Sequence, residues 1–192
     1  AIANFTFQNN SDLTFTDVTE SWGLDQKNFS NGATYADLDN DGDLELIVNN
    51  VDQEAQIYRN NSTNNFIKVK LKGSDQNLIG IDSRVFVKTP NNSQMQELTL
   101  SRGFQSSVST YLNFGLGDES IIESVKVVWP NGNSEQLNNV DINTTIEFDI
   151  NNSNKETLSD EKLNVYFENE QIVSHKHEEN IYNDYAKEVL LP

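Results

Sequence analysis

The sequence predicts an all-β protein, because hydrophobic and polar residues alternate and turn signals recur at regular intervals. In residues 66–72, Ile67, Val69 and Leu71 share one face of an extended chain and three lysines share the other, which indicates a half-buried antiparallel strand. The same alternation recurs in 84–88, 124–129 and 145–148. Turn sequences separate these runs, and strands at a spacing of about ten residues are typical of a sandwich or barrel. No segment before residue 155 has a convincing helical period.

The chain divides into three zones at asparagine-rich boundaries. Residues 1–62 hold an acidic stretch between short strands, residues 63–150 hold the even run of strands, and residues 151–192 form a weakly patterned tail. The middle zone is long enough for a core of its own. In the tail we expect a strand at 163–167 and a short helix within 181–189. Because the chain begins with Ala1 and ends abruptly, we interpret it as a piece of a longer polypeptide.

Charge and composition argue against several classes of protein. The chain has 192 residues and a formal net charge of -17, which repels the phosphate backbone of nucleic acids. No apolar run approaches the length of about 18 residues that marks a membrane-spanning helix, so we expect no membrane insertion. The absence of cysteine excludes a disulfide framework, a thiolate zinc site and a cysteine nucleophile.

An acidic loop, residues 37–45, leads directly into an apolar strand. Its acidic residues stand at alternate positions of the loop: Asp37, Asp39, Asp41, Asp43 and Glu45. Carboxylates this close repel one another unless a cation neutralises them. Calcium suits such a loop because it takes about six to eight oxygen ligands in flexible geometry, whereas magnesium prefers fewer protein ligands. The sequence therefore predicts a Ca²⁺ site.

The spacing assigns roles within the acidic loop and excludes an EF-hand. Gly42, at the sixth position, allows the sharp turn that wraps the loop around the ion. We expect side-chain oxygens from four of the five acidic residues and the backbone carbonyl from Asp43. An EF-hand needs a bidentate glutamate at the twelfth position, where this chain has Val48 in an apolar strand. The alternative is a solvated acidic turn that holds no ion.

Residues 12–61 resemble an FG-GAP/VCBS repeat. The matching pieces are 15–20, 30–33, 37–48 and 57–61, in that order. The resemblance implies a blade of a β-propeller whose acidic loop binds Ca²⁺, with Glu45 where the family usually has aspartate. A single blade cannot bury both of its faces alone. We therefore expect neighbouring propeller blades of the same longer chain as partners.

The next segment is similar to the ASPIC/UnbV domain, which follows such repeats in proteins like the cartilage acidic protein family. The matching pieces are 66–71, 79–85, 101–106, 112–117 and 125–132. The family often has Gly-Ala where this chain has Asp82-Ser83. Residues 177–192 resemble the lead-in to a further propeller section in long bacterial members. Together these resemblances imply a partial propeller-type blade at 1–62, a β-sandwich or barrel-like domain at 63–150, and a linker at 151–192.

Three further groups of residues are candidates for binding. His175 and His177 would share one face of an extended segment and could hold a transition metal, although we favour surface residues in a linker. Four aromatic residues could form a sugar-stacking platform, although we favour packing in the core or between blades: Trp22, Tyr35, Phe104 and Trp129. Arg102 is the residue that we expect at a ligand-facing edge.

No catalytic motif is present, because the chain lacks a nucleophile elbow, a Walker loop and a dinucleotide fingerprint. We therefore expect a non-enzymatic, extracellular calcium-binding scaffold or adhesion module at a bacterial outer surface, with outer-membrane or surface proteins as partners. The alternative is a carbohydrate-binding component of a surface glycan-capture system. A hydrolase would need two carboxylates free of the ion and is the least favoured hypothesis.

Overall fold

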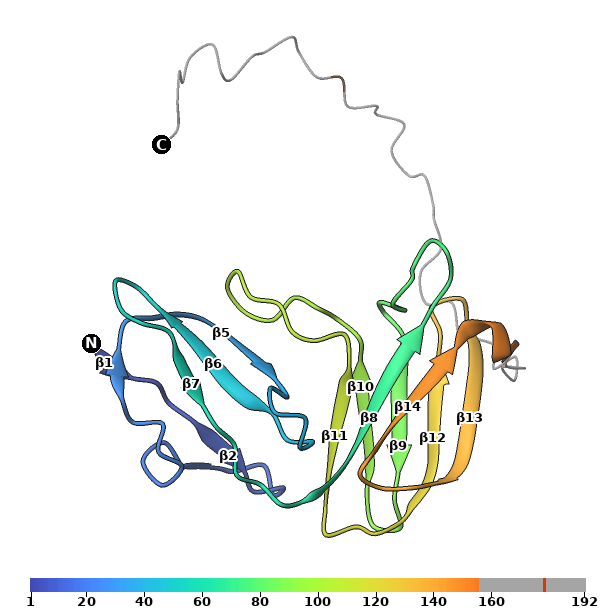
Figure 1. Ribbon diagram of the computed structural model, residues 1–192, viewed down its shortest axis with the longest axis horizontal. Helices are drawn as coiled ribbons and strands as arrows, with labels where there is room; N and C mark the ends of the chain where they lie inside the picture. Colours follow the sequence, from blue (N-terminus) through green and yellow to red (C-terminus); the bar gives the residue numbers. More distant parts are fainter. Residues whose placement is uncertain (156–177, 179–192) are drawn as a thin grey trace. The chain divides into compact units, whose positions relative to one another are not determined.

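A computed structural model describes residues 1–155 and residue 178 (Figure 1). Residues 1–155 belong to one compact unit. The strand expected at 163–167, the helix expected within 181–189, and His175 and His177 lie outside the described residues.

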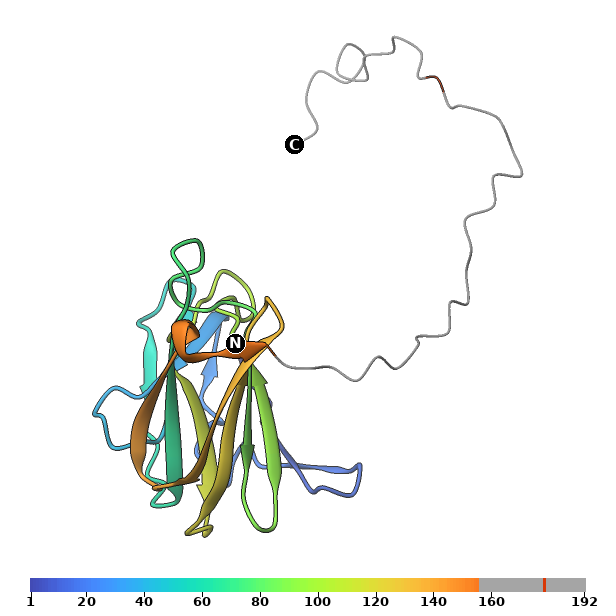
Figure 2. The same cartoon turned by 90° about the vertical axis from the view of Figure 1, so that its right-hand side faces the viewer.

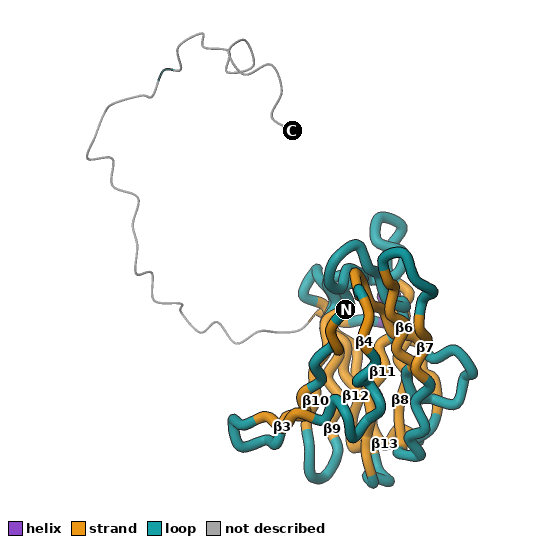
Figure 3. Tube along the Cα trace, turned by 90° about the vertical axis from the view of Figure 1, so that its left-hand side faces the viewer, coloured by secondary structure: helices purple, strands orange, loops and turns teal. Residues whose placement is uncertain are grey.

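The prediction of an all-β chain is confirmed for the described residues. They form fifteen strands and one short 3-10 turn, with loops between them and no α-helix (Figure 3). The strands associate in five small sheets, none of which closes into a barrel or a propeller within residues 1–155. No helix in this part of the chain is long and apolar enough to cross a membrane.

The first 58 residues form three small sheets. Their strands are β1 (Ile2–Ala3), β2 (Phe7–Asn9), β3 (Phe15–Asp17), β4 (Lys27–Asn28), β5 (Ser30–Ala36), β6 (Glu45–Asn50) and β7 (Gln56–Tyr58). Strand β1 pairs with β4, β2 pairs with β3, and β5, β6 and β7 form an antiparallel sheet with β6 in the middle. The strand predicted after the acidic loop is β6. Residues 1–62 are thus divided among three sheets, and their place in a propeller stays a prediction.

Residues 65–155 form the two-sheet domain. Its elements are β8 (Asn65–Lys72), β9 (Arg84–Lys88), β10 (Ser93–Glu97), β11 (Leu112–Gly117), β12 (Ile122–Val128), β13 (Asn133–Val140), β14 (Thr144–Asp149), the 3-10 turn η1 (Ile150–Asn152) and β15 (Asn154–Lys155). One sheet has the order β10-β9-β12-β13-β15 and the other the order β11-β8-β14 (Figures 1 and 2).

One hydrophobic core lies between the two sheets, and the predicted alternation builds it. Strand β8 buries Ile67, Val69 and Leu71, which face buried valines of β9 and β12 from the other sheet. Phe114, Trp129 and Phe148 are the largest side chains that are almost fully buried. Burial of this apolar surface is the main favourable contribution to the stability of the domain.

The prediction of a purely antiparallel strand at 66–72 was wrong on one side. Strand β8 pairs antiparallel with β11 but parallel with β14, in a register that sets Thr145 beside Lys68 and Glu147 beside Lys70. The connection from β13 to β14 crosses from one sheet to the other, so β14 runs in the same direction as β8. Hydrophobic alternation within one strand does not report which way its neighbour runs.

The Asp82-Ser83 pair keeps a backbone conformation that glycine adopts more easily. Asp82 has a φ of 66°, in the left-handed region where aspartate is tolerated but glycine is favoured. Ser83 is fully buried, and its hydroxyl has no hydrogen-bond partner. The nearby Gly80 also has a positive φ, and the ring of Trp129 leaves little space for a side chain there. The tight packing of this turn is thus retained despite the two larger residues.

Candidate functional site

The acidic loop connects β5 to β6 and brings its two ends together. Ala36 at the end of β5 pairs with Glu45 at the start of β6, so Asp37 and Glu45 lie at neighbouring positions. Two residues with positive φ, Asn40 at 62° and Gly42 at 103°, turn the chain within the loop. The N–H of Gly42 donates to Asp37 Oδ2 at 3.0 Å. The sharp turn predicted at Gly42 is confirmed.

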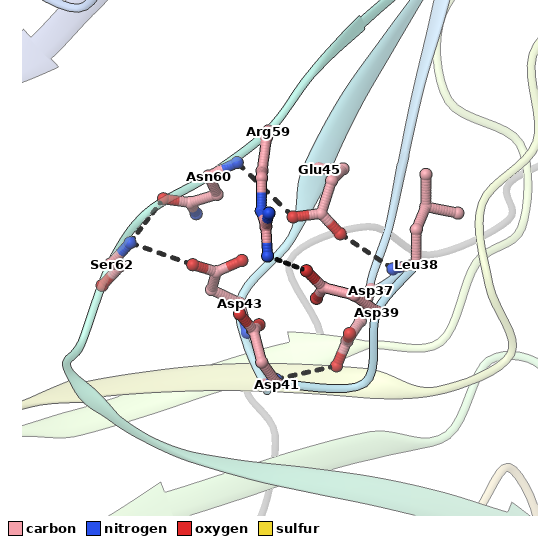
Figure 4. Close-up of polar contacts among 10 residues, drawn as sticks. Asp37, Leu38, Asp39, Asp41, Asp43, Glu45, Arg59, Asn60 and Ser62 are labelled. Carbon is pink, nitrogen blue, oxygen red and sulfur yellow. Dashed lines mark hydrogen bonds and ion pairs between the residues drawn. The ribbon is translucent and has the colours of Figure 1, made fainter.

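Three of the five predicted acidic residues converge in the structure. Asp37, Asp39 and Glu45 each place one carboxylate oxygen within 4.8 Å of the other two (Figure 4). The carboxylates of Asp41 and Asp43 are not part of this group among the described residues. A cluster made only of carboxylate oxygens suits a hard cation such as Ca²⁺.

Glu45, at the end of the acidic loop, also forms a hydrogen bond to the backbone at the start of the loop. Its side chain is almost fully buried, and its Oε2 accepts a hydrogen bond from the N–H of Leu38 at 2.8 Å. Its Oε1 accepts from the N–H of Asn60 at 3.4 Å, beyond the end of β7. The longer side chain of glutamate therefore links the loop to a second segment of the backbone.

Two carboxylate oxygens of the acidic loop are buried without a hydrogen-bond donor. They are Oδ1 of Asp37 and Oδ1 of Asp43. The Asp37 side chain is only 8% exposed. A buried acceptor without a partner is unfavourable by about 1 to 3 kcal/mol, and more when it is charged. A cation bound at the cluster would offset the buried charge of Asp37, so the residues present fit a metal ion.

Asp43 shows how crowded the negative charges are. Burial, the charge of Asp41, and the hydrogen bond and charge of Glu45 raise the pKa of Asp43 to about 6. The N–H of Ser62 donates to its Oδ2 at 3.0 Å, which opposes this shift only in part. Its own N–H donates to Asp41 Oδ1 at 3.2 Å. The fold therefore holds the Asp43 carboxylate where its negative charge is unfavourable unless a cation lies nearby.

Two basic side chains that the sequence analysis did not assign to the site contact the acidic cluster. Arg59 Nη2 lies 2.7 Å from Asp39 Oδ2, and Arg59 is largely exposed (Figure 4). Lys68 of β8 forms an ion pair with Asp37 Oδ2, and its side chain is only 13% exposed. Lys68 belongs to the face of its strand that the alternation assigns to solvent. No local pattern indicates a contact between residues that are 31 positions apart.

The acidic loop lies against β8 and β11 of the two-sheet domain. Besides the ion pair of Lys68, Asn113 Nδ2 donates to the carbonyl of Gly42 at 2.9 Å. The ring of Phe66 lies so close to Gly42 that a Cβ atom there would overlap it. The candidate metal site is thus part of the junction between β5–β6 and the two-sheet domain.

A cavity of about 780 Å³ opens beside the acidic loop. Its lining includes Tyr35, Asp37, Lys68, Arg102, Tyr111 and Asn113. The guanidinium of Arg102 has no ion pair or hydrogen bond to the described residues, and Oδ1 of Asn113 is buried without a donor. Arg102, which we expect at a ligand-facing edge, thus lines a cavity of ligand size, and its role in binding stays a prediction.

The four aromatic candidates have different surroundings. Trp129 is 2% exposed and belongs to the core of the two-sheet domain, which confirms for this residue the core packing that we favour over a sugar-stacking platform. Trp22 and Phe104 are exposed, and Tyr35 lines the cavity. Tyr111, which the sequence analysis did not single out, is a second aromatic residue of the lining.

These features define an all-β protein that carries a carboxylate cluster beside strands β8 and β11 of a two-sheet domain. Residues 73–155 match the family model described as ASPIC and UnbV, so the chain contains an ASPIC/UnbV domain, as the resemblance implied. The match begins after β8, although β8 contributes to the same core. It does not include residues 12–61, where the FG-GAP/VCBS resemblance stays a prediction. No curated protein matches the chain.

Proposed function

We propose that this chain is a non-enzymatic, extracellular calcium-binding module in which an FG-GAP/VCBS-type repeat carries the ion and the ASPIC/UnbV domain supports it. The observation that carries the proposal is the convergence of Asp37, Asp39 and Glu45, with three carboxylate oxygens within 4.8 Å of one another. The buried, unpaired Oδ1 of Asp37 supports it independently. Repulsion among the carboxylates supplies the physical reason for a cation.

The role of the ion in this proposal is structural. Asp37, Asp39 and Glu45 would hold Ca²⁺, and Asp41 and the carbonyl of Asp43 remain the further ligands that the loop spacing predicts. When bound, the ion would supply the positive charge that cancels repulsion and fixes the loop at the start of β6. No step of chemical catalysis is required of these residues.

Calcium is expected to raise the melting temperature of the chain, and a chelator is expected to lower it. A ligand at about 100 times its dissociation constant stabilises the folded state by about 2.7 kcal/mol, which corresponds to about 5 to 10 °C for a chain of this size. Calorimetry with CaCl₂ or EDTA measures the shift. Asp39→Ala should remove the dependence, whereas Asp75→Ala, in a turn outside the loop, should keep it. Identical curves with calcium and with EDTA would exclude a structural calcium site.

We further propose that the module binds neighbouring propeller blades of the same longer chain and, through them, proteins of a bacterial outer surface. Large exposed apolar side chains are frequent in residues 1–58; they include Ile2, Phe5, Phe7, Leu13, Phe15, Trp22, Phe29 and Ile57. Exposed apolar side chains that lie together, as the stacked rings of Phe5 and Phe7 do, are typical of surfaces that another protein segment covers. These exposed side chains support the proposal that residues 1–58 belong to a repeat that packs against neighbouring repeats.

Carbohydrate binding is the second candidate function, and the cavity beside the acidic loop favours it. Sugars stack on aromatic rings and supply hydroxyl donors and acceptors, for which Tyr35 and Tyr111 of the lining are suited. A glycan array probed with the chain tests this function. Arg102→Ala should abolish any signal, and Arg84→Ala, outside the lining, should leave it unchanged. An array without binding, or binding indifferent to Arg102, would contradict a saccharide site in this cavity.

A further inference from the structure

Three lysines at alternate positions of β8 have different partners. Lys70 and Lys72 form ion pairs with Glu147 and Asp149, which stand directly beside them on β14. The β14 neighbour of Lys68 is Thr145, which offers no charge. Lys68 instead pairs with Asp37 of the acidic loop and is 13% exposed, against 48% for Lys70. Lys68 alone of the three neutralises a candidate metal ligand.

The two oxygens of Asp37 have different surroundings. Oδ2 accepts from the N–H of Gly42 and from the ammonium of Lys68. Oδ1 is buried and has no donor. The carboxylate thus already has one cation at one oxygen, while its other oxygen has no partner. One oxygen of this carboxylate also lies within 4.8 Å of oxygens of Asp39 and Glu45.

We propose that Lys68 is a resident counter-cation of the metal site, which competes with calcium for the charge of Asp37 and thereby lowers the calcium affinity of the loop. This inference rests on the proposed calcium function. Because Lys68 belongs to the two-sheet domain, the same competition couples calcium occupancy to the attachment of the acidic loop to that domain.

The burial of the pair makes this competition strong. A calcium ion at this cluster would lie close to the Lys68 ammonium, and charges that are shielded from water interact more strongly than exposed ones. Arg59 also contacts the cluster, but its exposure weakens its effect. Removal of the Lys68 charge therefore has the larger effect on affinity.

Calcium titration of variants by isothermal calorimetry tests the inference. Lys68→Met keeps the apolar stem of the side chain and removes its charge, so it should bind calcium about tenfold more tightly than the parent chain. Lys70→Met is the matched control, because Lys70 lies on the same face of the same strand and pairs with β14. It should leave the affinity unchanged, as should Lys68→Arg, which keeps the charge.

The outcomes separate this inference from the proposed function. Calcium binding by the parent chain with equal or weaker binding by Lys68→Met would overturn the role of Lys68 and leave the calcium site intact. The absence of calcium binding by every variant would overturn both. Calcium binding by Lys68→Met but not by the parent chain would support the role of Lys68 as the cation that occupies the cluster.

A second measurement needs no variant and remains decisive if Lys68→Met does not fold. Lysine amines of the parent chain are labelled with a small amine-reactive reagent in calcium or in EDTA, and the sites are read by mass spectrometry. Calcium should increase the labelling of Lys68 by several-fold, because the ion weakens its contact with Asp37, and should leave Lys70 unchanged. Equal labelling of Lys68 in both conditions would overturn the inference.

Discussion

Replacing Gly42 with alanine is expected to lower the free energy of unfolding by about 3 kcal/mol, which combines a backbone and a packing contribution. An alanine at a φ of 103° is strained by about 1 to 2 kcal/mol. Its methyl group would overlap the ring of Phe66, and such overpacking is unfavourable by about 1 to 3 kcal/mol. Urea unfolding of the calcium-free chain measures the loss. Displacement of Phe66 should also weaken the attachment of the acidic loop.

Gly132→Ala is the matched control for the backbone contribution. Gly132 has a φ of 83° in the turn after Trp129, and no atom lies within 4 Å of where its Cβ would be. Its replacement should destabilise by about 1 kcal/mol, through backbone strain alone. Equal losses in the two variants would show that the Phe66 contact contributes nothing to the junction.

Truncation of Phe148 to alanine is expected to destabilise the chain by about 3 to 5 kcal/mol, which is the usual range for a buried phenylalanine. Phe148 of β14 is fully buried and packs in the core between the two sheets. Its loss removes apolar contacts and leaves a cavity that neighbouring side chains fill only in part. Urea unfolding followed by circular dichroism measures the change.

Phe86→Ala is the corresponding control on the outer face of β9. Val85 and Val87 point into the core, whereas Phe86 between them is exposed. Its truncation should change stability by about 1 kcal/mol or less. A loss as large as that of Phe148→Ala would contradict the assignment of one core between the two sheets.

The fold was predictable where a strand buries one face. The alternation in β8, β9 and β12 identified the strands and their inward residues, because a period of two follows from the pleat of a single strand. The parallel pairing of β8 with β14 was not predictable in this way, because pairing joins segments far apart in the chain. The division of residues 1–58 among three sheets was missed for the same reason.

The candidate site was predictable to the extent that it is local. The spacing of the acidic residues and the glycine between them indicated a tight carboxylate loop, and Asp37, Asp39 and Glu45 do converge. Spacing did not predict that the side chains of Asp41 and Asp43 turn to backbone N–H groups. Lys68 could not be assigned, because its place beside Asp37 depends on how the loop packs against β8.

The docked loop gives the proposed calcium site a second role. Gly42 and Asp37 contact Phe66, Lys68 and Asn113 of the two-sheet domain, so the residues that would bind the ion also connect two parts of the chain. Loss of the cluster is therefore expected to loosen this junction as well as the loop.

Direct titration of the parent chain with calcium tests the central claim, that the acidic loop holds one calcium ion. Isothermal calorimetry should show one ion per chain, with a dissociation constant between about 10⁻⁶ and 10⁻³ M, the range of sensor and extracellular sites. Asp39→Ala should lose this binding. The claim would be contradicted if the chain gave no binding heat at millimolar calcium and EDTA removed no calcium from the purified chain.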